Sequence, residues 1–151
     1  MIRNYNESDL DLDAIIRIWL EASIIAHNFI PQAYWERKVC EMRDIYIPSS
    51  NTYVYVDDSK NEVIGFISLV DNYIAALFVS PEHQGKSIGS QLMHHAKQLH
   101  KTLTLGVYTE NLNSVAFYKK HEFVIDNEKI EENTGKSEYV MIYTTNKMLN
   151  G

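Results

Sequence analysis

Apolar residues recur every three or four positions near the start of the chain, which is the spacing of one face of an α-helix. This spacing predicts one helix over Asp9–Ile25 and a second from Pro31 to a point near Pro48. The segment between them, which contains His27, breaks the pattern. A short run before the first helix, Ile2–Tyr5, predicts a strand.

In the middle of the chain Thr52–Asp57 alternates, with Tyr53 and Tyr55 opposite Val54 and Val56, which is the two-residue period of a β-strand. Two further runs predict strands, Val63–Val70 and Tyr73–Val79, and short polar turns separate the three. Because turns this short join antiparallel neighbours, we predict a three-stranded meander.

Helices and strands alternate in the last third of the chain. A helix over about Ser87–His100 leads to a strand at Leu103–Tyr108. This order fits a βαβ crossover between two parallel strands. A helix over Asn113–His121 then precedes two strands, Phe123–Glu131 and Ser137–Thr145, that would close the sheet as a hairpin. The chain therefore predicts an α/β fold in the order β-α-α-β-β-β-α-β-α-β-β, with a twisted mixed sheet flanked by helices.

Composition indicates one globular domain over residues 1–151, with 45% hydrophobic and 23% charged residues. No apolar run approaches the roughly 20 residues of a membrane span, and the N-terminus lacks the apolar core of a signal peptide. The single cysteine, Cys40, excludes an internal disulfide and suits a reducing compartment. We therefore expect a cytoplasmic protein with no membrane partner.

The formal net charge of −6 argues against a nucleic-acid binder, which would usually carry a basic face. It is compatible with an anionic cofactor, because a local nest of backbone amides can bind an anion in a negative protein. It also fits weak steering of a cationic acceptor such as an amine. Solubility alone explains the charge equally well.

One loop has the features of an anion-binding site. An apolar strand ends at Ser80-Pro81, a glycine-containing loop follows, and a helix then begins. Unpaired N–H groups and the dipole at such a helix start favour an anion, so we predict a phosphorylated ligand. The loop reads Gln84-Gly85-Lys86-Ser87-Ile88-Gly89-Ser90.

A nucleotide-phosphate enzyme is one alternative use of this loop. Gly85-Lys86-Ser87 matches the end of the phosphate-binding loop of nucleotide triphosphatases. That loop also needs a glycine five residues before Gly85, where this chain has Ser80, so we rank the alternative low.

A second segment, Asn111–Phe123, follows the loop after one helix and one strand. In this order the two segments strongly resemble the signatures of the GNAT superfamily of N-acetyltransferases. The first signature is Arg or Gln, two residues, Gly, one residue, and Gly or Ala; the second is an Asn, Ala and Phe-Tyr arrangement followed by Gly-Phe. Ser87 and Glu122 stand where the family usually has glycine. The element order also matches. Within the family, the chain looks most like the small bacterial YiaC/YjaB-type acetyltransferases in three segments: Trp19-Leu20-Glu21, His27-Asn28-Phe29-Ile30 and Tyr34-Trp35.

The resemblance implies acetyl-coenzyme A as cosubstrate. The amides of the loop would wrap the pyrophosphate, and the end of the third meander strand would pair with the pantetheine arm. That pairing requires the strand Leu103–Tyr108 to splay away, which a bulge near Val79–Ser80 would achieve. The implied cofactor-binding residues are Leu77, Phe78, Val79, Gln84, Gly85, Lys86, Ser87, Ile88, Gly89, Ser90, Asn111, Ser114 and Phe117.

The chemistry of the transfer requires a proton donor and a proton acceptor. By resemblance, Tyr118 is the general acid for the leaving thiolate, since a phenol with a pKa of about 10 is protonated at neutral pH. The Val79 amide would stabilise the oxyanion. An alkyl amine arrives protonated, and the base that takes its proton is left open among His27, a bound water and four other side chains. Those four are Glu21, Asp71, Tyr73 and Glu110.

The acceptor pocket of the family is usually built at the break between the first two helices, where His27 lies. We therefore name His27 as a candidate catalytic residue, although a lone loop histidine is more often structural. Phe29, Trp35 and Tyr73 either line this pocket or belong to the core. We expect no metal, because His94, His95 and His100 lack the ligand spacing of a metal site.

The sequence thus predicts transfer of an acetyl group to a primary amine: a protein lysine, a protein N-terminus or a small molecule. The lysine is slightly favoured. A non-catalytic acyl-coenzyme A sensor is the alternative, supported by Ser87 and Glu122 in place of glycine. Acylation of aminoacyl-tRNA is disfavoured by the acidic charge. A monomer and a homodimer both fit.

Overall fold

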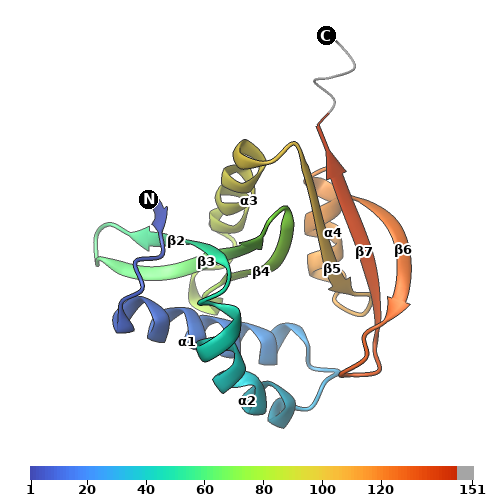
Figure 1. Ribbon diagram of the computed structural model, residues 1–151, viewed down its shortest axis with the longest axis horizontal. Coiled ribbons are helices and arrows are strands. Elements are labelled where there is room, and N and C mark those ends of the chain that lie inside the picture. Colours follow the sequence, from blue (N-terminus) through green and yellow to red (C-terminus); the bar gives the residue numbers. More distant parts are fainter. Residues whose placement is uncertain (146–151) are drawn as a thin grey trace.

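The computed structural model describes residues 1–145; residues 146–151 of the predicted domain lie outside the described part. Seven strands form one mixed sheet in the order β1-β2-β3-β4-β5-β7-β6, as Figure 1 shows. The predicted α/β class and element order are confirmed, with a π-helical turn at Met42–Tyr46 and a short 3-10 turn at Pro81–His83 in addition. The elements are β1 (Ile2–Asn4), α1 (Asp9–Ala26), α2 (Gln32–Glu41), β2 (Asn51–Asp57), β3 (Glu62–Val70), β4 (Tyr73–Val79), α3 (Ile88–Leu99), β5 (Thr102–Tyr108), α4 (Leu112–Lys120), β6 (Val124–Ile130) and β7 (Ser137–Thr144).

Two hydrophobic cores lie on opposite faces of the sheet. Neighbouring residues of β3 point to different faces, so Phe66 packs in the core of α1 and α2, whereas Ile67 packs in the core of α3 and α4. Because both faces of β3 are covered, this strand is apolar almost throughout. Helices therefore cover both faces of the sheet, and the position of the site depends on how the strands are arranged.

Strands β4 and β5 run parallel but pair only at Tyr73↔Thr104 and Ile74↔Leu105. Beyond this point β4 follows β3, and the β3–β4 register skips one residue, so Ala75 forms a β-bulge. The two strands therefore diverge towards their C-terminal ends (Figure 1). The predicted splay is confirmed. The predicted position of the bulge near Val79–Ser80 is wrong, because those residues are still regularly bonded to β3.

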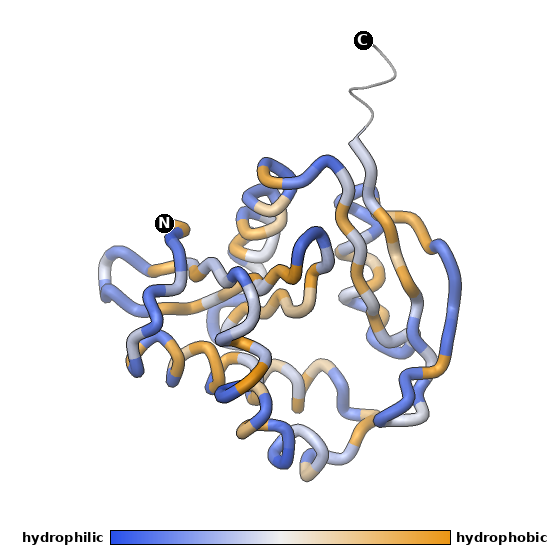
Figure 2. Tube along the Cα trace, viewed as in Figure 1, coloured by the Kyte–Doolittle hydropathy of each residue, from blue (hydrophilic) through white to orange (hydrophobic). Residues whose placement is uncertain are grey.

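The edge strand β6 is apolar only at its ends. Figure 2 shows the hydrophilic stretch between them along the rim of the sheet, and Asp126, Glu128 and Lys129 supply charge there. Charged side chains on an edge discourage the addition of another strand. The central part of this edge is therefore protected against pairing with a further strand.

Helix α4 ends in a Schellman motif. The N–H of Phe123 donates to the Tyr118 carbonyl oxygen at 3.0 Å, and the N–H of Glu122 donates to that of Lys119 at 3.0 Å. Glu122 has a φ of +72°, in the left-handed region that favours glycine. The chain therefore makes this turn with glutamate in a conformation that favours glycine, at a cost in backbone strain.

We predict that Glu122→Gly raises the free energy of unfolding by about 1 kcal/mol, because glycine adopts a left-handed backbone without the Cβ clash. The midpoint of thermal unfolding should rise by about 2–4 °C. Glu36→Gly, at an exposed position inside α2, is the matched control and should lower stability by about 1 kcal/mol. A less stable Glu122→Gly protein would contradict the assignment of strain.

Candidate active site

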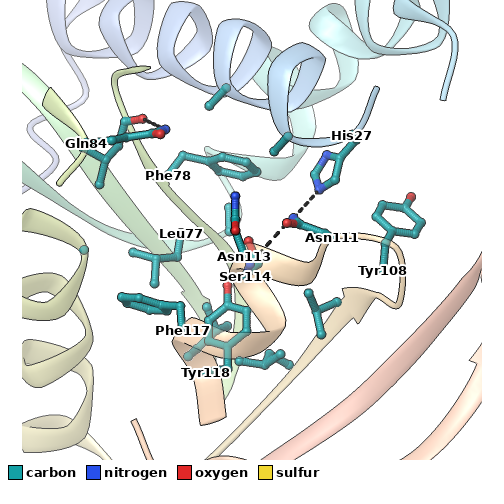
Figure 3. Close-up of a pocket in the computed structure, with 18 of the residues that line it drawn as sticks. His27, Leu77, Phe78, Gln84, Tyr108, Asn111, Asn113, Ser114, Phe117 and Tyr118 are labelled. Atoms are coloured by element: carbon teal, nitrogen blue, oxygen red, sulfur yellow. Dashed lines mark hydrogen bonds between the residues drawn. The ribbon is translucent and has the colours of Figure 1, made fainter. Parts of the chain in front are cut away.

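A cavity of about 1060 Å³ lies where β4 and β5 diverge. Its walls come from both strands, from the loop before α3, from α4 and from the end of α1 (Figure 3). Lys86 and Phe29 are outside its lining. The predicted site residues that do line it are Leu77, Phe78, Val79, Gln84, Gly85, Ser87, Ile88, Gly89, Ser90, Asn111, Ser114, Phe117, Tyr118, His27, Trp35 and Tyr73.

The end of β4 has one free edge. The N–H of Ser80 donates to the carbonyl of Ile64 on β3 at 2.8 Å. Because N–H groups alternate along a strand, those of Val79 and Leu77 point to the other edge, towards the cavity. The side-chain amide of Gln84 donates to the Val79 carbonyl at 3.1 Å and so fastens the loop to this end of the strand. An extended ligand could pair with the edge as an added strand.

The start of α3 forms a nest of backbone N–H groups. The first helical hydrogen bond runs from the Gln91 N–H to the Ser87 carbonyl at 3.1 Å, so the N–H groups of Ile88–Ser90 precede the helical ladder. Gly85 and Ser87 both have a left-handed backbone, with φ of +81° and +65°. Amides and dipole together make this turn a site for phosphate. Ser87 keeps the required conformation without glycine.

Helix α4 turns one face to the cavity, and Figure 3 shows Ser114, Phe117 and Tyr118 along it. The backbone of Gly89 lies beside the Phe117 ring, since a Cβ added there would be 3.5 Å from it, in ordinary van der Waals contact, so the start of α3 packs against α4. Burial, together with the nearby Tyr73, raises the pKa of Tyr118 to about 12. Its hydroxyl therefore stays protonated at neutral pH.

Asn111 joins the two sides of the cavity. Its side-chain oxygen accepts from the Ser114 N–H at 3.2 Å and caps α4, which leaves its NH₂ group to donate to His27 Nε2 at 3.1 Å. Figure 3 shows both bonds. Since His27 Nε2 accepts, the ring proton of the neutral imidazole lies on Nδ1. His27, the C-cap of α1, is thus hydrogen-bonded to Asn111, the N-cap of α4.

His27 is 8% exposed and lies in an aromatic cluster. Its ring centroid is 5.1 Å from that of Trp35, 5.1 Å from that of Tyr108 and 5.8 Å from that of Phe29. Burial lowers the pKa of His27 to about 4, so the ring is neutral at pH 7. Because Asn111 occupies its Nε2, this geometry favours a positioning role; the catalytic assignment of His27 stays a prediction.

The remaining base candidates divide in two. Glu110 and Tyr73 line the cavity, whereas Glu21 and Asp71 are outside its lining. The sequence analysis missed Tyr108 and Glu138, which also line it. The pairing of β5 with β7 brings these two residues together, since Tyr108 lies opposite Glu138. The available signal for Glu138 was a charged residue directly before the apolar and aromatic run of β7.

Residues 1–145 contain no group of three or more His, Cys, Asp or Glu side chains placed to hold a metal ion. Within the same part of the chain, no helix combines the length and apolarity needed to cross a bilayer.

Comparison with known proteins agrees with this geometry. A family model described as an acetyltransferase (GNAT) domain matches residues 48–125. The peptidyl-lysine N-acetyltransferase YiaC of Escherichia coli (strain K12) is 35% identical over 126 residues, which span 83% of this chain and 84% of the relative.

Solved structures share the fold. The solution structure of apo-form YjaB from Escherichia coli has a TM-score of 0.83 at 23% identity and covers 95% of this chain and 96% of that one. A putative streptothricin acetyltransferase from Bacillus anthracis, in complex with acetyl coenzyme A, has a TM-score of 0.57 at 22% identity over 67% of this chain and 65% of that one. Since a family model matches half of the sequence and a relative is 35% identical over most of both lengths, this chain belongs to the GNAT family of acetyltransferases and is an acetyl-transferring enzyme.

Proposed function

We propose that this enzyme transfers the acetyl group of acetyl-coenzyme A to a primary amine, with a protein lysine side chain as the favoured acceptor. The observation that carries the proposal is the free edge of β4, which borders the same cavity as Tyr118. The peptidyl-lysine activity in the name of YiaC supports the choice of acceptor. The acetyl coenzyme A complex of a structural neighbour supports the choice of donor.

The residues present fit acetyl-coenzyme A. The N–H groups of Ile88–Ser90 suit its pyrophosphate, and the exposed Lys86 adds positive charge beside them. The edge of β4 at Leu77 and Val79 suits an extended amide-containing arm. When bound, acetyl-coenzyme A would supply a thioester whose carbonyl carbon is the electrophile.

Tyr118 is the proposed general acid. As the amine nitrogen bonds to the acetyl carbon and the carbon–sulfur bond breaks, the departing sulfur takes the electron pair and then a proton. The Tyr118 hydroxyl can donate that proton because burial raises its pKa to about 12. We assign to the Val79 N–H the stabilisation of charge on the carbonyl oxygen.

The amine must lose a proton before it attacks. Three side-chain candidates for the base line the cavity, His27, Tyr73 and Glu110. A water molecule that binds with the substrates is the other candidate. Burial raises the pKa of Tyr73, so its phenol is a poor acceptor at neutral pH. We place His27 in the acceptor pocket, where it holds Asn111 and thereby the start of α4.

A non-catalytic acyl-coenzyme A sensor is the competing function, and the two replaced glycines favour it. Ser87 and Glu122 both take the left-handed conformation, however, so the backbone that glycine would form is retained. A sensor would also have no use for Tyr118 at the cavity. We therefore favour the enzyme.

Calorimetric titration of acetyl-coenzyme A, followed by a thiol-release assay with amines and lysine peptides, tests the proposal. Saturable binding with acceptor-dependent thiol release is the expected result. Binding without release for any amine would support the sensor. A protein that binds no acetyl-coenzyme A would contradict both functions.

Tyr118→Phe should lower kcat by about 10²- to 10³-fold, because it removes the proton donor and little volume. The dissociation constant for acetyl-coenzyme A should change by less than about threefold. Tyr143→Phe, on β7 and outside the cavity lining, is the matched control and should retain full turnover. Equal losses in kcat and in cofactor affinity for Tyr118→Phe would remove it from the acid role.

Ser87→Gly should keep or improve acetyl-coenzyme A affinity, since glycine fits a φ of +65° without strain. Ser87→Ala removes the hydroxyl but keeps the strain, so the pair separates the two contributions. We expect both variants to bind within about threefold of the wild type in calorimetry. A loss of tenfold or more in both would show that the hydroxyl contacts the cofactor.

His27→Ala should raise KM for the acceptor by about tenfold and leave acetyl-coenzyme A affinity unchanged. The pH profile of wild-type kcat adds a second readout. Because burial lowers the His27 pKa to about 4, its protonation should reduce activity only as pH falls towards that value, and not near 6.5. An unchanged acceptor profile would leave His27 a purely structural residue.

A further inference from the structure

Glu138 is a carboxylate at the cavity that takes no part in the acetyl transfer itself. Glu138 lies on β7 opposite Tyr108 of β5, and its side chain is only 15% exposed. It lines the same cavity as Tyr118. A carboxylate this far buried is costly unless a cation or several donors face it.

The backbone of β5 leaves room for this side chain. A Cβ added to Gly106 would lie 3.0 Å from Glu138 Oε2, so the carboxyl group occupies the space above the glycine. Burial and the Glu138 charge raise the pKa of Tyr73, and the same charge contributes to the raised pKa of Tyr108. The carboxylate thus lies near two phenol side chains from neighbouring strands.

The cation that now faces Glu138 is itself a lysine. Lys129 Nζ is 3.5 Å from Glu138 Oε1, and the Lys129 side chain is 59% exposed on β6. An ion pair with so exposed a partner is weak and readily exchanged. A primary ammonium on a flexible aliphatic chain therefore already fits this carboxylate.

Other acidic groups nearby are less suited to hold a ligand. Glu110 also lines the cavity, but its side chain is 53% exposed and lies 3.9 Å from Lys136. The Glu131 carboxylate accepts from the N–H groups of Asn133 and Thr134 in the β6–β7 turn. Glu138 combines burial, a place at the cavity and a replaceable partner.

We propose that Glu138 binds the ammonium group of the acceptor and makes the enzyme selective for cationic alkyl amines, of which the lysine side chain is one. The proposal rests on the acetyl transfer to an amine proposed above. The acceptor displaces Lys129, and Tyr73 and Tyr108 add aromatic surface beside the cation. Glu138 is a binding residue here, and the proton of the ammonium leaves through the base already discussed.

The test compares two acceptors in steady-state kinetics at one pH. The first is a lysine derivative blocked at its α-amino and carboxyl groups, which is cationic, and the second is an arylamine, which is neutral. Glu138→Gln should raise KM at least tenfold for the cationic acceptor and less than twofold for the neutral one. Glu132→Gln, an exposed change of equal charge in the same hairpin, is the matched control and should change neither.

Lys129→Met should change KM for the cationic acceptor in the opposite direction, because it removes the ion-pair partner of the Glu138 carboxylate. It should lower KM for the cationic acceptor by about twofold or more and leave acetyl-coenzyme A affinity unchanged. Equal effects of Glu138→Gln on both acceptors, or an unchanged KM for the cationic one, would overturn the proposal while the transferase stands. A wild-type enzyme that acetylates no amine would overturn the proposed function and this inference together.

Discussion

The divergence of β4 from β5 is the constraint on which the site depends. Two adjacent parallel strands would normally bond along their length, and here they do so only at Tyr73 and Ile74. The bulge at Ala75 keeps β4 with β3 and releases its other edge. Without it, the N–H groups of Leu77 and Val79 would be used within the sheet, and no cavity would lie beside Tyr118.

A second constraint connects the two sides of the cavity. The two cores lie on opposite faces of the sheet, and the hydrogen bond between His27 and Asn111 connects the end of α1 to the start of α4. Since Asn111 also caps α4, this contact orients the helix that carries Tyr118. Both side chains are buried, so the bond lies in surroundings of low polarity that strengthen it.

Local patterns predicted most of the fold and one half of the site. The loop Gln84–Ser90 and the helix with Tyr118 are each one continuous segment, so the local geometry of each follows from short-range rules. Ser87 illustrates the limit, because only the structure shows that a serine takes the left-handed turn. Glu138 comes to the cavity through strand pairing far along the chain, and the bulge at Ala75 depends on register. Neither long-range pairing nor register can be read from one sequence.

The central claim is that the free edge of β4 and the nest at α3 bind acetyl-coenzyme A. Amide hydrogen exchange, measured by nuclear magnetic resonance with and without saturating acetyl-coenzyme A, tests it most directly. The account predicts slower exchange at the N–H groups of Val79 and Ile88–Ser90, with little change in β1 and β2. Saturable binding that leaves these amides unprotected would contradict it.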